Sequence, residues 1–435
     1  MKARCYFLVF LIFFIFFMET TIFGAGKPAF SQLLTIDLDK AFQLALENDK
    51  SIKAAESDVA KAGEGRRQAH RSRNVTLTIE HSTMRTEHQN HGINVNSFQN
   101  IVSATYPLYT GGLIEGSIAA SEYELRSKIL SLERAYQDVK LSVAVAFFTM
   151  LRTKDMAELA GESVERLEAH VRNVDVQYRN GNVGRADLLR SEVELINAAQ
   201  AMSQAVNEYR IAVKSLNSII GLPLGTELFY GGEMSYTAFP YTLDECVEYA
   251  LSRHPDLAIA KLLKKKAGAG IVIEESGRRP RVTLAASHTF NSPHNWPGLE
   301  RDNLQVAIRA EYTFSDGGVT DSKIRGARED LRRAGYNYES VRDTIILNVT
   351  RHFMTMEEAG LRIETGARAV DMAQEAYRIA LVRYREGVGT NIDVLDAHAA
   401  LSQSESNHTQ ALCDYNIAVA RLVNAMGVPA SFEEI

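Results

Sequence analysis

The sequence is poor in cysteine, since its 435 residues include three, Cys5, Cys246 and Cys413. No two of them form a CxxC pair, and none has the spacing to a histidine that zinc ligands show, which excludes a cysteine-based metal cluster. Cys5 lies in an N-terminal segment that we expect to be removed. We therefore expect Cys246 and Cys413 to be two buried free thiols.

An excess of positive charge is also absent. The formal net charge is -6, and lysines and arginines are scattered along the chain, so no basic patch predicts nucleic-acid binding. The HExxH, Walker and nucleophile-elbow motifs do not occur, and we expect no enzyme and no cofactor. His81, His88 and His91 surround one polar loop, where solvated histidines are far commoner than metal ligands, so we expect no metal site.

Long hydrophobic runs are limited to one, Tyr6–Met18, which follows Lys2 and Arg4 and precedes small residues that end at Gly26. This pattern predicts a secretory signal peptide over 1–26. The run is shorter than the roughly 20 residues that a spanning helix needs, although an N-terminal anchor is the alternative. Charged residues interrupt every later apolar stretch, so we expect any membrane span to consist of strands.

Proline is scarce, and none lies between Pro107 and Pro223 or between Pro297 and Pro429. Because proline breaks helices, these two intervals are free to form long ones. In the second interval apolar residues recur every seventh position, with a second interleaved set, which is typical of a coiled coil. The recurring positions are Val349, Phe353, Met356, Gly360, Ile363, Ala367, Val370, Gln374, Tyr377, Leu381 and Tyr384. Glycines at 181–184 and 387–389 predict the turns of two antiparallel helical hairpins.

The sequence repeats itself with a period of about 206 residues. Leu38-Asp39 recurs as Leu243-Asp244, Gly63 as Gly268, and Tyr178-Arg179-Asn180-Gly181 as Tyr384-Arg385-Glu386-Gly387. Such a long register predicts a tandem duplication. We expect the repeats at 33–229 and 241–429, joined by a linker at 230–240 and followed by a short tail at 430–435. Each repeat is predicted to hold a strand pair, at about 74–109 and 281–314, and a helical hairpin, at about 113–221 and 319–427.

The predicted strands alternate apolar and polar residues. In 303–314 the apolar set is Leu304, Val306, Ile308, Ala310, Tyr312 and Phe314. A soluble sheet with one buried face shows the same alternation, but strands of about ten residues with aromatic residues at one end are typical of a transmembrane barrel. Four strands cannot close on themselves, and an open edge in lipid is costly. We therefore expect an oligomer, and three chains would supply 12 strands.

The chain resembles the TolC-type outer-membrane efflux proteins. The resemblance rests on the joint Tyr106-Pro107-Leu108-Tyr109-Thr110-Gly111-Gly112 and on the turn from Arg383 to Ala397, together with the duplication. It implies an α+β membrane protein, a homotrimer with a 12-stranded β-barrel in the outer membrane and a periplasmic α-helical barrel. It also implies a passive exit duct of a tripartite efflux pump or type I secretion system. The implied partners are outer-membrane lipid, a periplasmic adaptor and, through the adaptor, an inner-membrane transporter. A soluble periplasmic helical scaffold or adaptor is the alternative function.

The resemblance also implies a periplasmic constriction, onto which Asp393 and Asp396 fall, with Asp187 as their counterpart in the first repeat. These acids share a helix face, since residues three apart do so. The alternative is that they only complement the helix dipole, with Thr390 and Asp393 as a capping box. Some family members carry an arginine latch where this chain has Gly389, so we do not expect that latch here.

The hairpin turns are the expected docking tips for an adaptor. They comprise Val183, Gly184, Arg185, Val388, Gly389 and Thr390. Glycine permits close approach by a partner, although helix capping explains it equally well. We expect the strand-to-helix joints at Gly111, Gly112, Gly317 and Gly318.

Overall fold

The computed structural model describes residues 35–88, 93–226, 229–292 and 301–429, so the predicted signal peptide, the tail and His91 lie outside the described residues. The chain divides into two units. The small one contains β1 (Thr35–Ile36) and β4 (Phe229–Tyr230), which pair in parallel with Thr35 opposite Phe229. All the other helices and strands described below belong to the second unit, which begins at Asp37.

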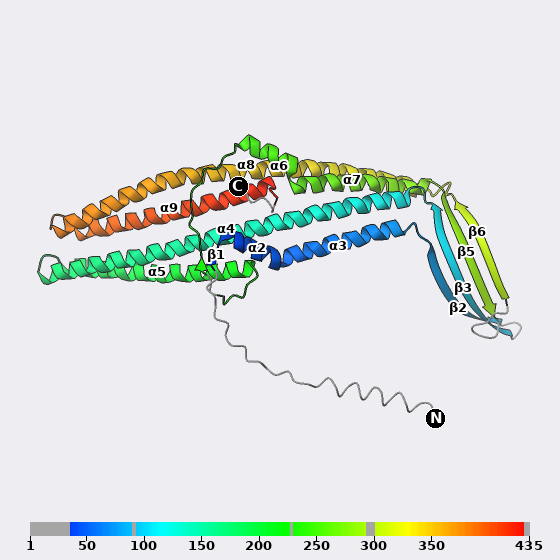
Figure 1. The fold of residues 1–435 in the computed structure, drawn as a ribbon, viewed down its shortest axis with the longest axis horizontal. Helices are drawn as coiled ribbons and strands as arrows, with labels where there is room; N and C mark the ends of the chain where they lie inside the picture. The colour runs from blue at the N-terminus through cyan, green and yellow to red at the C-terminus, as the bar shows by residue number, and fades with distance from the viewer. Residues whose placement is uncertain (1–34, 89–92, 227–228, 293–300, 430–435) are drawn as a thin grey trace, which may run out of the picture. The chain divides into compact units, whose positions relative to one another are not determined.

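The second unit repeats one order of elements (Figure 1). The first repeat contains α2 (Leu38–Asn48), α3 (Lys50–Arg71), β2 (Thr76–His88), β3 (Ile93–Tyr109), α4 (Leu113–Arg179) and α5 (Arg185–Ile219). The second contains α6 (Leu243–Arg253), α7 (Pro255–Glu275), the 3-10 turn η1 (Ser276–Arg278), β5 (Arg281–Ser292), β6 (Arg301–Glu311), α8 (Val319–Arg385) and α9 (Asn391–Met426). Both α4 and α8 have 67 residues, so the duplication extends to the length of the longest helices.

Local sequence signals explain where these helices begin. Asp49 accepts hydrogen bonds from the backbone of Ser51 and Ile52 at the start of α3, and Pro255 occupies the first turn of α7, where its missing N–H costs nothing. Gly112 and Gly318 precede α4 and α8 with φ of 100° and 87°. Few side chains tolerate that conformation, so these two glycines allow the change from strand to helix.

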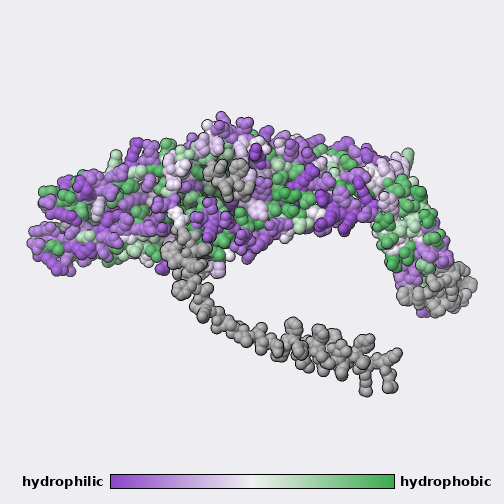
Figure 2. Space-filling view, viewed as in Figure 1, coloured by the Kyte–Doolittle hydropathy of each residue, from purple (hydrophilic) through white to green (hydrophobic). Residues whose placement is uncertain are grey.

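The four long strands form one antiparallel sheet in the order β2-β3-β5-β6. Ile79 lies opposite Val102, and Leu284 lies opposite Ile308. Since directly opposed residues share a face, the apolar residues of all four strands collect on one side. Leu77 is 75% exposed and Leu304 is 70% exposed on that side, and Figure 2 shows hydrophobic residues gathered over these strands. The predicted alternation is therefore confirmed as an exposed apolar face.

The polar interruptions of this face contact each other. His81 and Asn100 lie directly opposite, with Nδ1 and Oδ1 2.8 Å apart, and Thr83 Oγ1 lies 3.1 Å from His81 Nε2. Asn100 breaks the predicted alternation, and its hydrogen bond to His81 reduces the cost of placing both groups on an apolar face. No helix within the described ranges is both long and apolar enough to cross a membrane.

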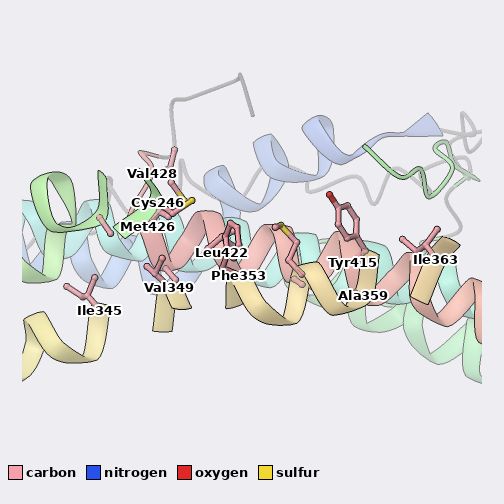
Figure 3. Packing of buried hydrophobic residues seen from close by; sticks show 14 of the residues in the cluster. Cys246, Ile345, Val349, Phe353, Ala359, Ile363, Tyr415, Leu422, Met426 and Val428 are labelled. Carbon is pink, nitrogen blue, oxygen red and sulfur yellow. The ribbon is translucent and has the colours of Figure 1, made fainter. Parts of the chain in front are cut away.

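A hydrophobic core joins α6, α8 and α9 (Figure 3). Val349 and Phe353 of α8 contact this core together with Leu422 of α9. Cys246 belongs to it, and both Cys246 and Cys413 are buried and free, as predicted.

The predicted heptad seam of α8 is buried over its first half and packs again at its end, where Tyr377, Leu381 and Tyr384 join one apolar cluster, but it is interrupted in between. Val349, Met356 and Ile363 are buried, but Ala367 and Gln374 are exposed. Gly366 faces the partner helix instead, since a Cβ there would lie 3.4 Å from His408 Cα. A straight helix has 3.6 residues per turn, so a strict seven-residue register drifts away from its neighbour.

Candidate functional site at the hairpin turns

The turn between α4 and α5 and the turn between α8 and α9 have the same construction. Gly181 and Gly387 follow the helix ends with φ of 78° and 74°. Asn182 N donates to Gln177 O at 2.9 Å in the first turn, and Val388 N donates to Arg383 O at 3.0 Å in the second. These bonds satisfy carbonyls that would otherwise be unpaired at a helix end. The sequence folds sharply here because glycine supplies the left-handed conformation.

The residues at the two tips differ in exposure. Val183 packs against the small apolar cluster of Val174, Tyr384 and Val394, whereas Val388 of the second tip is 68% exposed. Gly184 is open to solvent, but a Cβ at Gly389 would lie 3.1 Å from the carbonyl carbon of Arg383. The tips are therefore distinct surfaces, and the second one presents the more apolar contact.

The three acids predicted at the constriction also differ. Asp393 forms a capping box with Thr390, whose hydroxyl accepts from Asp393 N at 3.3 Å while Thr390 N donates to Asp393 Oδ2 at 2.9 Å. The hydrogen bonds from the Thr390 backbone and side chain lower the pKa of Asp393. Asp396 lies exposed on the first turns of α9. Asp187 lies in the first turn of α5, and its carbonyl accepts from Asn391 Nδ2 at 3.0 Å.

Asn391 is the centre of a buried polar group that we call the tip node, formed with His170 and Ser191. Asn391 Oδ1 lies 2.6 Å from His170 Nε2 and accepts from Ser191 Oγ at 3.1 Å. All three residues are buried. The tip node therefore connects α4, α5 and α9, and so connects the first repeat to the second, next to the predicted acids.

Burial determines the charge state of this node. It lowers the pKa of His170 and raises the pKa of Tyr384, which Asp187 raises further. The rings of His170 and Tyr384 are 5.3 Å apart. Both groups are therefore neutral near pH 7, because desolvation disfavours their charged forms.

A second buried histidine lies further along the contact between α4 and α9. Burial, followed by the Arg166 guanidinium, lowers the pKa of His398 to about 4. Its Nε2 lies 3.2 Å from Ser163 Oγ. Nearby, Arg166 Nη2 donates to Glu405 Oε2 at 2.9 Å. Polar side chains of α4 and α9 thus form hydrogen bonds at several positions along the contact between the two helices. This contact is therefore more polar than the hydrophobic core shown in Figure 3.

Sequence reasoning did not identify the tip node. The duplication contains a signal for it, because the counterparts of His170, Ser191 and Asn391 are Ala376, Ala397 and Arg185. Three polar residues of the node thus lack a matching residue in the other repeat. In the described part of the chain, no three His, Cys, Asp or Glu side chains are grouped closely enough to hold a metal ion.

Comparison with known proteins decides the family. The model of the family described as outer membrane efflux protein matches residues 41–222 and 246–428, one match in each repeat. The chain belongs to this family. Its members are transport channels rather than enzymes, so this chain is an outer membrane channel protein, and the alternative of a soluble periplasmic scaffold is wrong.

Individual relatives of this efflux family protein are distant. Outer membrane protein TolC of Vibrio cholerae is 20% identical, and the alignment covers 72% of each chain. Alkaline protease secretion protein AprF of Pseudomonas aeruginosa is 25% identical over 67% of this chain and 62% of its own length. The MtrE outer membrane channel of Neisseria gonorrhoeae superimposes with a TM-score of 0.79 at 20% identity, covering 90% of this chain and 88% of that one. The predicted α+β fold of strand pairs and helical hairpins is thus confirmed.

Proposed function

We propose that three copies of this chain form a passive outer-membrane duct for efflux or secretion. The observation that carries the proposal is the sheet. Among the described strands, β2 pairs only with β3 and β6 pairs only with β5, so both edges are open. An apolar face with open edges is unstable in lipid unless another copy pairs with them. Three copies of four strands give a 12-stranded barrel wide enough for a water-filled lumen.

The long helices support the same assembly. The exposed side of α8 carries apolar residues seven positions apart, Leu347, Met354 and Leu361. A second exposed apolar stripe lies on α5 at Leu189, Val193 and Ile196. Such stripes are unfavourable in water and fit contacts with neighbouring helices. In the trimer they would seal the wall of a periplasmic helical barrel.

The hairpin turns would then form the periplasmic end of the duct. We assign Asp393 and Asp396, with Asp187, to the constriction, and the exposed tips at Val183–Arg185 and Val388–Thr390 to docking of a periplasmic adaptor. An inner-membrane transporter bound to that adaptor would supply the energy. AprF is named for protease secretion and OpmQ for pyoverdine export, so both polypeptides and small molecules are candidate cargoes.

Two measurements test this function. Purified protein added to planar bilayers should produce discrete conductance steps, and its mass in mild detergent should equal three chains. A chain that stays monomeric and leaves bilayers unconductive contradicts the proposal. Cells that lack the chromosomal gene should fail to export the cargo, and a plasmid that carries the wild-type gene should restore its export. The compound or protein that behaves in this way is the cargo.

A further inference from the structure

The duplication allows one contact inside the chain to be compared with a surface that has no partner. In the part of the second unit next to the strands, the helices lie in a row in the order α3, α4, α7, α8 (Figure 1). The strands follow the same order, β2-β3-β5-β6. The central contact, between α4 and α7, joins the first repeat to the second. The outer sides of α3 and α8 are the two ends of the row.

At the central contact the start of α4 fits closely against the end of α7. A Cβ at Gly111 would lie 2.9 Å from Ser276 O, and one at Gly116 would lie 2.8 Å from Ile273 Cγ1. These distances leave no room for a side chain. Further along, Lys266 Nζ of α7 donates to Glu124 Oε2 of α4 at 2.6 Å.

The equivalent surfaces at the two ends of the row have open space in front of them. Gly317 and Gly318 of the α8 start correspond to Gly111 and Gly112, and a Cβ at either would meet no atom within 4 Å. On the outer side of α3, an open hollow of about 510 Å³ is lined by Glu64, Arg67, Gln68, Arg71 and Ser72. Their counterparts in the second repeat are Ala269, Val272, Ile273, Ser276 and Gly277. Four of these five counterparts, all but Gly277, contact the start of α4 at Gly111, Gly112 or Gly116.

The charged pair of the central contact has counterparts of the same charge at the two ends of the row. The counterparts of Lys266 and Glu124 are Lys61 on α3 and Asp330 on α8, both exposed. Inside the chain Asp330 contacts only the neighbouring turn, through Arg333 at 2.9 Å. The other charges at these ends have partners inside the chain, since Arg67 of the hollow pairs with Glu64 and Asp321 of α8 pairs with Arg278. The charge match between the two end surfaces therefore rests on Lys61 and Asp330, which preserve the charges of Lys266 and Glu124.

We propose that the α3 hollow receives the start of α8 from a second copy of this chain, with Lys61 paired to Asp330 across the contact. The inference rests on the proposed trimer and adds which residues meet. Each copy uses two different surfaces, so the contact is head-to-tail and closes into a ring if the rotation permits. It repeats between copies the contact that α4 and α7 make within one copy.

Cross-linking tests the register. Lys61→Cys combined with Asp330→Cys should join two copies through a short bifunctional thiol reagent, because paired side chains place their Cα atoms too far apart for a direct disulfide. Denaturing gels should then show dimers and covalent trimers. Lys266→Cys with Glu124→Cys should react within one chain and leave the mass unchanged. Lys61→Cys with Glu329→Cys, one position away on α8, should give a severalfold lower yield.

Charge reversal gives a second readout that needs no reagent. Lys61→Glu and Asp330→Lys should each weaken the trimer by about two- to fivefold per contact, as expected for an exposed ion pair. The double variant should recover the wild-type value. A trimer of normal mass whose Lys61 and Asp330 cysteines do not cross-link, or whose double reversal shows no recovery, overturns this register and leaves the duct intact. A monomer in detergent overturns the trimer itself.

Discussion

Asn391 Oδ1 lies 2.6 Å from His170 Nε2, and this contact joins two residues from different repeats. The Asn391 amide has one orientation here, because its Nδ2 donates to Asp187 O at 3.0 Å. Oδ1 therefore accepts, and His170 must carry its proton on Nε2. The tip node thus holds the starts of α5 and α9 against α4 through direct hydrogen bonds.

Replacing Asn391 should loosen the hairpin turns. Asn391→Ala leaves His170 Nε2 without its partner, whereas Ser191 Oγ keeps its hydrogen bond to Asp187 O, and an unsatisfied buried group costs about 1–3 kcal/mol. Hydrogen exchange at the starts of α5 and α9 should accelerate by at least about fivefold in the detergent trimer. Asn407→Ala on the exposed side of α9 is the matched control. Unchanged exchange in Asn391→Ala would mean that apolar packing alone holds the turns.

Acidification should weaken the contact between α4 and α9. His398 is 7% exposed, and its folded pKa is about 4 against an unfolded value near 6.5. Between these values the unfolded chain binds more protons, so stability is complete above about pH 6.5 and falls as the pH falls toward 4. The full loss is about 3 kcal/mol, and His170, whose pKa is also lowered, adds to it in the same direction.

Thermal melting of the trimer between pH 7 and pH 4.5 measures this effect. His398→Gln keeps a hydrogen-bonding group for Ser163 but cannot take up a proton, so its melting temperature should depend less steeply on pH. Asn407→Gln, on the exposed side of α9, should keep the wild-type slope. If His398→Gln follows the wild-type curve, other groups cause the acid sensitivity.

Periodicity predicted the parts of the fold whose pattern repeats along the chain. The alternation at Leu304–Phe314 predicted an exposed strand face, and the heptads around Val349–Ile363 predicted a buried seam, because both depend on neighbours a few residues away. The tip node could not be predicted this way. His170, Ser191 and Asn391 come from three helices, and a polar residue acquires a partner only when the helices pack.

The same limit explains other differences. The helices α3 and α7 were not predicted: α3 carries few apolar residues, and the apolar residues of α7 do not follow a single helical period. Val183 and Val388 were both predicted to lie at docking tips, yet Val183 packs against Tyr384 and Val388 is exposed. The sequence pattern shows that the chain is duplicated. Packing between the two repeats determines which of two corresponding residues is buried.

The thiols of Cys246 and Cys413 should be unreactive. Burial raises the pKa of Cys413 to about 11, so about one thiol in a thousand is ionised at pH 8. Burial also raises the pKa of Cys246. A thiol reagent should label neither in the folded trimer and both in denaturant. Ser203→Cys, at an exposed position on α5, should label at once, and rapid labelling of the native protein would show that the α9 contact opens.

Substitution at Gly184 should separate docking from folding. Gly184 has an ordinary φ of -77°, and its nearest neighbour to an added Cβ is Asp187 Oδ2 at 3.9 Å. Gly184→Leu should therefore keep the trimer and block export. Gly389→Leu is a less clean test, because its Cβ would meet the backbone of Arg383 and Tyr384 at 3.1 Å. Gly225→Leu is the control, and full export by Gly184→Leu would exclude this tip from docking.

The constriction itself is best tested at Asp396. In the trimer, carboxylates from three copies would line a narrow passage, where their concentrated negative charge attracts cations. Within one chain, however, Asp393 caps its own helix, and its pKa is lowered by Thr390. Asp393→Asn therefore changes the helix start as well as the charge, at a cost of about 1 kcal/mol. Asp396→Asn removes only charge.

Asp396→Asn should consequently reduce the cation preference of the bilayer conductance, and Asp393→Asn with Asp396→Asn should abolish block by multivalent cations. The reason is that the field of the ring scales with its number of charges, while a capping carboxylate neutralised by its own helix end contributes less. Asp39→Asn, in the first turn of α2, controls for net charge. If selectivity and cation block survive the double substitution, both acids serve only the helix start, and the narrowest point of the duct lies elsewhere.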